Sequence, residues 1–452
     1  MKKTGSVAVY LCSNCGTDYP KWLGQCPSCN EWGTLSEYKV SKSKQGSKNR
    51  TPSKSTPLTD ILQKKQTKRI PTHIAEVDRV LGGGILPGSL ILLGGNPGIG
   101  KSTLALQMLG KVNRPSLYIS AEESEDQIAM RAKRLQISSS EMQLSGENHV
   151  DNILEQIISL KPEVVIIDSI QTVYSDSIDS LPGSVSQIRE SGQQLLQICK
   201  ERGVTIVLIG HVTKEGIIAG PRMLEHMVDT VLYLEGDDRY DHRILRSVKN
   251  RFGATNEVGI FQMQSDGLIE VENPSELFLA ERSVNVAGSA IFPSLEGTRP
   301  ILVEVQALVS NANFGTPQRN VNGIDLRRLS MLLAVFEKRL KLPMGTRDTF
   351  VNLVGGLRID DPAADLAVIG AIASSALEKP IPQNMILIGE VGLAGEVRSV
   401  SQLEKRLIES QTLGFESAIV PKYGFKKANQ TSENMKYYQV DSVKKAFEII
   451  FP

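Results

Sequence analysis

Apolar runs of strand length alternate with helical periods between residues 59 and 272 of the chain. Four of these runs predict strands, at 90–93, 116–119, 164–167 and 204–209. Helical patterns fall at about 101–110, 124–135, 150–160 and 184–202. Strands that alternate with helices predict a parallel sheet with helices packed on its faces. Three later runs, near 228–234, 243–250 and 257–263, have no helical pattern between them and predict antiparallel additions.

After Asn273 and Pro274 the pattern restarts with a strand and a long helix at 323–340. Further strands alternate there with helical patterns at 362–377 and 402–412, which predicts a separate α+β domain. A chain of 452 residues is long enough for two or three domains. We expect four segments, at 1–36, 37–58, 59–272 and 273–452.

Composition places the chain among ordinary soluble proteins, with 40% apolar and 22% charged residues. Its longest apolar runs are far shorter than the roughly 20 residues that a membrane helix requires. The N-terminus has no sustained apolar stretch, which argues against a signal peptide. We therefore expect a cytoplasmic protein with no membrane partner.

Net charge is only +1, so the charge of the whole chain indicates no partner. Residues 39–69, however, contain ten Lys or Arg and one acid, which gives a local charge of +9. This composition favours a solvated basic linker, and the alternative is a tether that also contacts phosphates.

Four of the five cysteines lie in the first 29 residues as two C-x-x-C pairs separated by ten residues. They are Cys12, Cys15, Cys26 and Cys29. In a cytosolic protein this spacing is typical of a tetrahedral Zn²⁺ site rather than of disulfides. Because four thiolates leave no open position, the predicted zinc is structural. The isolated Cys199 falls in a helical pattern and is expected in the core.

The phosphate-binding pattern G-x-x-x-x-G-K-[ST] is matched between a predicted strand and a predicted helix, which is the context that the pattern requires. Its nine residues are Gly95, Asn96, Pro97, Gly98, Ile99, Gly100, Lys101, Ser102 and Thr103. Glycines allow the backbone to wrap phosphates, and the helix N-terminus supplies N–H donors. We expect Lys101 to bind the β and γ phosphates of ATP and Ser102 to ligate Mg²⁺.

Three further candidates follow the carboxyl ends of predicted strands, where open α/β sheets bind their ligands. Asp168 ends a buried strand and is expected to hold Mg²⁺ through water. Glu122 is the candidate that orients or deprotonates the attacking water, with Glu123 as its rival. His211 is a candidate sensor of the γ phosphate, and a structural histidine is an equally good interpretation.

Residues Lys249, Asn250, Arg251, Phe252 and Gly253 end another strand. Side chains two apart on a strand share a face, so Lys249 and Arg251 should project together while Asn250 points away. Two cations on one face suit a polyphosphate, either the nucleotide of a neighbouring subunit or a nucleic-acid backbone. A solvated edge strand would have the same composition.

These features together resemble the bacterial RadA (Sms) family of DNA repair proteins. The resemblance is carried by the four-cysteine ribbon, the phosphate loop followed by Lys249 to Gly253, and the segment that begins at Gly355 and ends at Asp365. It covers essentially the whole chain. The implied fold is α/β, a RecA-like P-loop ATPase core with an N-terminal zinc ribbon and a C-terminal α+β Lon-protease-like domain.

The resemblance also implies a function in homologous recombination. It implies a DNA-dependent ATPase that assembles as a hexameric ring, binds nucleotide between subunits, and promotes branch migration on single-stranded and branched DNA with the RecA recombinase. Lys249 and Arg251 would then be catalytic. The expected DNA loops are 171–186 and 212–225, in which Tyr174 would stack on a base while Lys214 and Arg222 meet phosphates; plain connectors are the alternative.

The C-terminal domain departs from the Lon protease pattern. Ala363 stands where the resemblance places the nucleophilic serine, and Glu404 stands where it places the partner lysine, although a one-residue shift would bring Lys405 there. Neither Ala363 nor Glu404 can perform that chemistry. We expect an inactive scaffold for oligomerisation, and the alternative functions are a nucleotide-switched adaptor that recruits a recombinase or an ATP-dependent protease.

Overall fold

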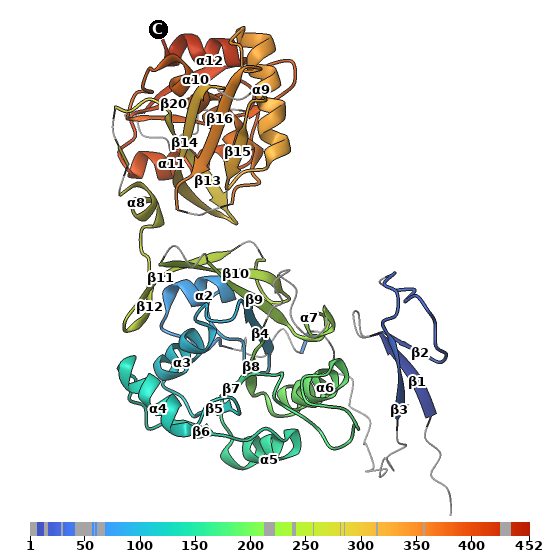
Figure 1. Cartoon of the computed structure of the whole chain (residues 1–452). Helices are drawn as coiled ribbons and strands as arrows, with labels where there is room; N and C mark the ends of the chain where they lie inside the picture. Colours follow the sequence, from blue (N-terminus) through green and yellow to red (C-terminus); the bar gives the residue numbers. More distant parts are fainter. Residues whose placement is uncertain are drawn as a thin grey trace, which may run out of the picture. The chain divides into compact units, whose positions relative to one another are not determined.

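The computed structural model shows a chain that divides into two compact units, Met1–Glu270 and Val271–Pro452 (Figure 1). The described residues are 7–12, 17–28, 30–40, 57, 59–60, 68–211, 222–236, 241–255, 257–280, 282–283, 285–312, 315–355, 358–424 and 435–452. Within them, no helix combines the length and the apolar character that crossing a bilayer demands.

The N-terminal ribbon is a three-stranded antiparallel sheet in the order β2-β1-β3. Its strands are β1 (Val7–Cys12), β2 (Asp18–Tyr19) and β3 (Leu35–Val40). Cys12 and Cys26 are buried beside Leu35 and form no disulfide. The other two predicted zinc ligands, Cys15 and Cys29, lie outside the described residues, as does most of the basic linker.

A nine-stranded sheet in the order β12-β11-β10-β9-β4-β8-β7-β5-β6 forms the centre of the domain that follows the linker. Its parallel strands are β4 (Leu90–Gly95), β5 (Ser116–Ser120), β6 (Met142–Ser145), β7 (Val164–Asp168), β8 (Thr205–Ile209) and β9 (Thr230–Glu235). Its antiparallel strands are β10 (His242–Asn250), β11 (Val258–Gln264) and β12 (Gly267–Glu270).

One strand direction predicted from the sequence is wrong. The run near 228–234 was expected to be an antiparallel addition, but β9 pairs parallel with β4. The short helix α7 (Arg222–Met227) precedes β9, so the chain enters β9 through a crossover rather than a hairpin. Only β10 to β12 are antiparallel additions among the described strands.

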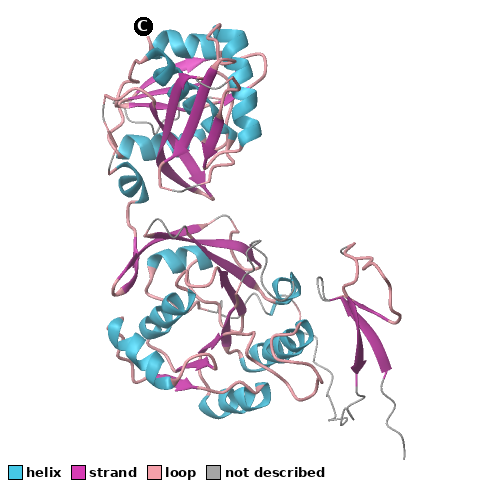
Figure 2. Ribbon diagram, viewed as in Figure 1, coloured by secondary structure: helices cyan, strands magenta, loops and turns pink. Residues whose placement is uncertain are grey.

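Alternation along the strands creates two cores, one on each face of the sheet. Ile91 and Leu93 of β4 pack on the face that holds helix α3, while Leu90 and Leu92 pack on the opposite face. Helices therefore cover both faces (Figure 2). They are α2 (Ala75–Leu81), α3 (Lys101–Val112) and α4 (Glu125–Arg134) on the first face and α5 (Val150–Leu160), α6 (Val185–Arg202) and α7 on the second.

The C-terminal unit is built on a seven-stranded mixed sheet in the order β15-β16-β14-β13-β17-β20-β21. Its strands are β13 (Ser289–Glu296), β14 (Arg299–Asn311), β15 (Arg319–Asn322), β16 (Arg347–Leu353), β17 (Met385–Leu387), β20 (Ser417–Pro421) and β21 (Lys436–Val440), with a separate pair β18 (Glu390–Val391) and β19 (Val397–Arg398). Its helices are α8 (Pro274–Leu279), α9 (Leu326–Leu340), α10 (Asp365–Leu377), α11 (Leu403–Thr412) and α12 (Val443–Ile450). The apolar helix α10 is buried against β13 and β14 and forms the centre of this unit.

Candidate active site

The phosphate loop joins β4 to α3 and has the backbone shape that only glycine adopts easily. Gly95 has a φ of 153°, and a Cβ there would lie 2.5 Å from the carbonyl oxygen of Leu234. Gly98 has a φ of 79° and open space where its Cβ would stand. The glycines therefore allow the loop to turn into the N-terminus of α3, where backbone N–H groups attract anions.

Lys101 is buried at the start of α3 with only 4% of its surface exposed. Its Nζ donates to the carbonyl oxygens of Gly95 and Asn96, each at 2.9 Å. Burial lowers the pKa of Lys101, and the carboxylates of Asp168 and Glu122 oppose this shift. Since both hydrogen-bond partners are neutral, the ammonium charge is available to an anion in the loop.

Asp168 is the last residue of β7 and is buried. Its Oδ2 accepts a hydrogen bond of 2.7 Å from the hydroxyl of Tyr118 on the neighbouring strand β5. Burial and the nearby Asp168 carboxylate hold the pKa of Tyr118 well above its usual range, so the phenol stays protonated and donates. Ser102, the other predicted Mg²⁺ ligand, is half-buried in the first turn of α3.

The two neighbouring glutamates behind β5 have different surroundings. Glu122 accepts a 2.5 Å hydrogen bond from the hydroxyl of Ser169, and the Nε2 of His211 lies 3.6 Å from the same carboxylate oxygen. Glu123 instead pairs with Arg131 of α4. Glu122 therefore lies beside Ser169 after β7 and His211 after β8. The charge of Glu123 is compensated by Arg131 instead.

Lys249 and Arg251 reach the same backbone segment, as the spacing predicted. The Nζ of Lys249 donates to the carbonyls of Glu225, His226 and Val228, and Arg251 donates to the His226 carbonyl and to Asp229. Asn250 points away and is buried, with its Nδ2 donating to the carbonyl of Leu81. Both cations therefore cover the C-terminal end of α7, to which helix carbonyls attract positive charge.

The candidate DNA loops are only partly described. Lys214 and the side chain of Arg222 lie outside the described residues. The backbone of Tyr174 forms a parallel bridge with His149, and the two rings meet edge to face at 5.1 Å. Tyr174 is therefore held against the start of α5.

Two site residues, Tyr118 and Ser169, were missed in the sequence. Tyr118 lies in a run that predicted only a strand, yet alternation places Ser116, Tyr118 and Ser120 on one face of β5. Ser120 is paired in register with Asp168 of β7, so Asp168 lies on the same face of the sheet. A polar side chain on the ligand face of a buried strand was the available signal.

In the C-terminal unit, Ala363 is buried in the short 3₁₀ turn Pro362–Ala364 that precedes α10. Glu404 and Lys405 are both exposed on α11. The next residue, Arg406, is fully buried and donates to the carboxylate of Asp361 at 2.5 Å and to the Pro293 carbonyl at 2.6 Å. The buried cation of α11 is therefore bonded to the carboxylate of Asp361, two residues before Ala363.

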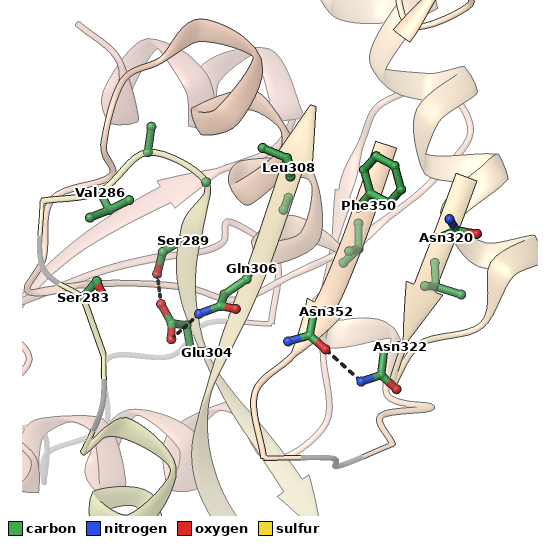
Figure 3. Close-up of a pocket in the computed structure, with 15 residues that line it drawn as sticks. Ser283, Val286, Ser289, Glu304, Gln306, Leu308, Asn320, Asn322, Phe350 and Asn352 are labelled. Atoms are coloured by element: carbon green, nitrogen blue, oxygen red, sulfur yellow. Dashed lines mark hydrogen bonds between the residues drawn. The ribbon is translucent and has the colours of Figure 1, made fainter. Parts of the chain in front are cut away.

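A cavity of about 450 Å³ also lies in the C-terminal unit, over strands β13 to β16 (Figure 3). Glu304 accepts hydrogen bonds from Ser289 and Gln306, and Asn322 donates to Asn352 at 2.8 Å. Its described lining includes no Lys or Arg to bind a phosphate. In this respect the cavity differs from the phosphate loop, which holds Lys101.

Three family models match separate parts of the chain. The ATPase family described as KaiC matches residues 70–276, the rubredoxin metal binding domain matches residues 10–37, and the family described as subunit ChlI of Mg-chelatase matches residues 305–424.

Full-length relatives are more informative. The DNA repair protein RadA of Bacillus subtilis is 49% identical over 430 residues, which cover 93% of each chain. The protein of the same name from Listeria monocytogenes is 48% identical over 428 residues, again 93% of each chain. That of Chlamydia pneumoniae is 47% identical over 445 residues, or 98% of each.

Two solved structures have lower similarity. A KaiC-like protein of Pyrococcus horikoshii is 21% identical with a TM-score of 0.39, and covers 46% of this chain and all of its own. The RadB recombinase is 22% identical with a TM-score of 0.36, and covers 45% of this chain and all of its own.

Proposed function

Because this chain belongs to the RadA family of DNA repair proteins, we propose that it is a DNA-dependent ATPase that moves along single-stranded DNA during recombinational repair. Its movement promotes branch migration of recombination intermediates. It acts as a hexameric ring in the cytoplasm, with single-stranded and branched DNA and the RecA recombinase as partners. Support comes from a RecA-like ATPase core joined to a zinc ribbon and a Lon-like C-terminal domain.

The observation that carries the proposal is the convergence of Lys101, Asp168 and Glu122 beside the glycine loop. Burial lowers the pKa of the Lys101 ammonium and the carboxylates of Asp168 and Glu122 oppose this shift, which supports one shared electrostatic site. The loop has open space beside Gly98. The N-terminus of α3 attracts the negative charge of phosphates. ATP therefore fits the residues present.

Each side chain has a proposed role in hydrolysis. Lys101 binds the β and γ phosphates, and its carbonyl partners are exchanged for phosphate oxygens. Ser102 and, through water, Asp168 would hold Mg²⁺, which would supply positive charge to the phosphates. Glu122 orients the attacking water and accepts its proton, while Ser169 fixes the rotamer of that carboxylate. His211, 3.6 Å from Glu122, links the site to the segment that follows β8.

Lys249 and Arg251 are proposed to serve the nucleotide of a neighbouring subunit. In the single chain they are bonded to carbonyls at the end of α7 and to Asp229. Carbonyls are weaker partners for a cation than phosphate oxygens are. A neighbouring triphosphate would therefore withdraw both side chains from α7, which follows one of the proposed DNA loops.

The ribbon is proposed to hold structural zinc. Cys12 and Cys26 are buried and, with Leu35, make up a very small core. A core of this size is typically stabilised by a metal or by disulfides. The four thiolates of Cys12, Cys15, Cys26 and Cys29 would supply a closed tetrahedral site.

The direct test is ATP turnover with and without single-stranded DNA. Wild-type protein should hydrolyse ATP faster when an oligonucleotide is added. Lys101→Ala should lose about 10²–10³-fold in turnover because a principal charge contact to the phosphates is removed. The matched control is Lys111→Ala, an exposed lysine at the other end of the same helix, which should retain activity. Absence of DNA binding in every nucleotide state would refute the DNA part of the proposal.

A second assay separates the motor from an adaptor that only recruits a recombinase. The motor should extend branched DNA in an ATP-dependent manner, and Lys101→Ala should not. If ATP is hydrolysed while the branch point stays in place, the chain acts as an adaptor.

A further inference from the structure

Asp229, which directly precedes β9, is a buried carboxylate that pairs with two cations. Its side chain is only 2% exposed, whereas both cations are about half exposed. The Nζ of Lys200 lies 3.0 Å from one carboxylate oxygen, and the Nη1 of Arg251 lies 3.3 Å from the other. The backbone N–H of Leu90 also donates to the oxygen that Lys200 contacts, at 3.1 Å. Arg251 has a proposed role at a neighbouring nucleotide, but Lys200 has none so far.

Lys200 is held in place by the fold of its own domain. It lies in the last turn of α6, where the helix carbonyls favour a positive charge. Besides Asp229, it contacts the carbonyl oxygen of Gly88 at 3.4 Å. Gly88 packs closely on the end of α6, since a Cβ there would lie 3.4 Å from the carbonyl oxygen of Cys199. These two acceptors keep the ammonium group beside Asp229.

Arg251 is held less firmly. It follows β10, and its guanidinium donates to Asp229 at 3.3 Å and to the carbonyl of His226 at 3.4 Å. Both distances exceed the roughly 2.7–3.2 Å of a typical N–H···O hydrogen bond. The backbone N–H of Arg251 donates separately to the carbonyl of Asp229, at 3.1 Å. The side chain can therefore leave the carboxylate while the turn after β10 stays in place.

The cost of that departure depends on Lys200. A buried carboxylate that loses its last cation is strongly destabilised, because the uncompensated charge stays out of water. Asp229 would be in that condition if Arg251 were its only cation. Because Lys200 remains 3.0 Å away, the carboxylate stays paired when Arg251 moves. Burial and the adjacent charge of Arg251 lower the pKa of Lys249, while Asp229 opposes the shift, so the cations at this carboxylate repel one another.

We propose that Lys200 is a positioning residue for ATP hydrolysis, which keeps Asp229 paired so that Arg251 can leave it for the nucleotide of a neighbouring subunit. Lys200 itself touches no phosphate and acts through Asp229. The guanidinium of Arg251 exchanges the carboxylate for phosphate oxygens, which it can bind through two parallel N–H donors. This inference rests on the proposed function, in which Arg251 serves that nucleotide.

Steady-state ATP turnover of the full-length protein, at saturating ATP and single-stranded DNA, tests the role of Lys200. Lys200→Met removes the charge and keeps a long side chain. Turnover should fall about fivefold, the effect of one partly exposed ion pair, because Arg251 is then retained by Asp229. Lys200→Arg should restore most of the activity. The matched control is Arg202→Met, which removes another cation from the last turn of α6 and should hydrolyse ATP as the wild type does.

A double variant distinguishes this role from a contribution to stability. Asp229→Asn removes the charge that retains Arg251, and its amide oxygen can still accept from the N–H of Leu90. Lys200→Met combined with Asp229→Asn should therefore regain nearly wild-type turnover, whereas a residue needed only for folding would not be rescued by losing its partner. Thermal unfolding of each variant shows whether it is folded at the assay temperature.

Two results overturn the proposal. They are wild-type turnover in folded Lys200→Met, and a folded double variant that is as slow as Lys200→Met. If Lys200→Met does not fold, the double variant is compared with the wild type, since it buries no unpaired charge at this position. Turnover reduced fivefold or more in that variant then overturns the proposal.

The proposed function can fail separately, and Arg251→Ala shows which part has failed. Wild-type turnover in Arg251→Ala would refute the role of Arg251 at a neighbouring nucleotide, and the role of Lys200 with it. A large loss in Arg251→Ala together with wild-type turnover in Lys200→Met would refute only the role of Lys200.

Discussion

The proposed ATPase site and the C-terminal unit each contain a buried cation, Lys101 and Arg406, but the two cations have different partners. Lys101 donates to two neutral carbonyls and has carboxylates nearby, with no ion pair at bonding distance among the described residues. Arg406 is fully buried and bonded to the carboxylate of Asp361. Lys101, whose partners are neutral, remains available to a ligand, whereas Arg406, which is fully buried and paired with a carboxylate, is part of the fold.

The carboxylates differ in the same way. Asp168 and Glu122 accept hydrogen bonds from the hydroxyls of Tyr118 and Ser169, which orient them without cancelling their charge. In the C-terminal unit, Asp365 pairs with Arg328 and also accepts from the backbone N–H of Val391. Hydroxyl partners preserve the charge that catalysis requires, and arginine partners neutralise it.

The strongest test of this comparison separates the two adjacent glutamates. Glu122→Gln should reduce ATP turnover about 10²–10⁴-fold, the usual contribution of a general base, because the amide cannot accept the proton of water. Glu123→Gln should change turnover little, because Glu123 pairs with Arg131. Steady-state phosphate release at saturating ATP measures both variants. The assignment is wrong if Glu123→Gln shows the larger loss.

Arg406→Ala tests the structural half of the comparison. Removing one partner of a buried ion pair typically costs 3–5 kcal/mol, and we expect about 3 kcal/mol because Asp361 is partly exposed. Calorimetry of the full chain should show earlier unfolding of the C-terminal unit, while ATP turnover at low temperature is retained.

The matched control for this substitution is Arg398→Ala. Arg398 pairs with Glu396 at 2.5 Å, but both side chains are exposed. An exposed pair contributes about 0–1 kcal/mol, so unfolding should hardly move. Equal destabilisation by the two variants would show that burial of Arg406 is not what makes its pair structural.

Tyr118→Phe tests the orienting hydroxyls with a smaller expected effect. Loss of a second-shell hydrogen bond to a metal-binding carboxylate typically weakens metal affinity 10–100-fold, and we expect about tenfold more Mg²⁺ for half-maximal turnover. Turnover at saturating Mg²⁺ should approach that of the wild type. Tyr423→Phe, which alters an exposed tyrosine, serves as the control. An unchanged Mg²⁺ requirement in Tyr118→Phe would mean that its hydroxyl only satisfies a buried group.

The sequence indicates the proposed ATPase-site residues more directly than their supporting contacts. The glycine loop, Asp168 and Glu122 are candidates because each follows a strand-length apolar run, and strand ends meet at one edge of a parallel sheet. The direction of β9 was wrong, since the six-residue helix α7 is too short to give a periodic signal. Tyr118 was hidden because an aromatic residue within an apolar run is typical of any strand.

The C-terminal unit shows a different limit of sequence reasoning. Periodicity placed α9, α10 and α11 within a few residues, but α8, α12 and several strands, β21 among them, were not predicted. Arg406 was overlooked because an arginine in a helical pattern usually lies on the surface. Its partner Asp361 is 45 residues away in the chain, so only the folded structure reveals the pair.

The smallest effect is expected for Ala363→Ser, which should gain no protease activity. A serine hydroxyl becomes a nucleophile only when a neighbouring base accepts its proton. Glu404 and Lys405 are exposed on α11, and the buried Arg406 is always charged and bonded to Asp361. We therefore expect no casein digestion by Ala363→Ser with or without ATP, and stability close to that of the wild type. ATP-dependent cleavage of casein by this variant would show that a base does reach the turn before α10. The C-terminal unit would then also hold a charge available for chemistry, and the contrast between Lys101 and Arg406 would no longer separate the two domains.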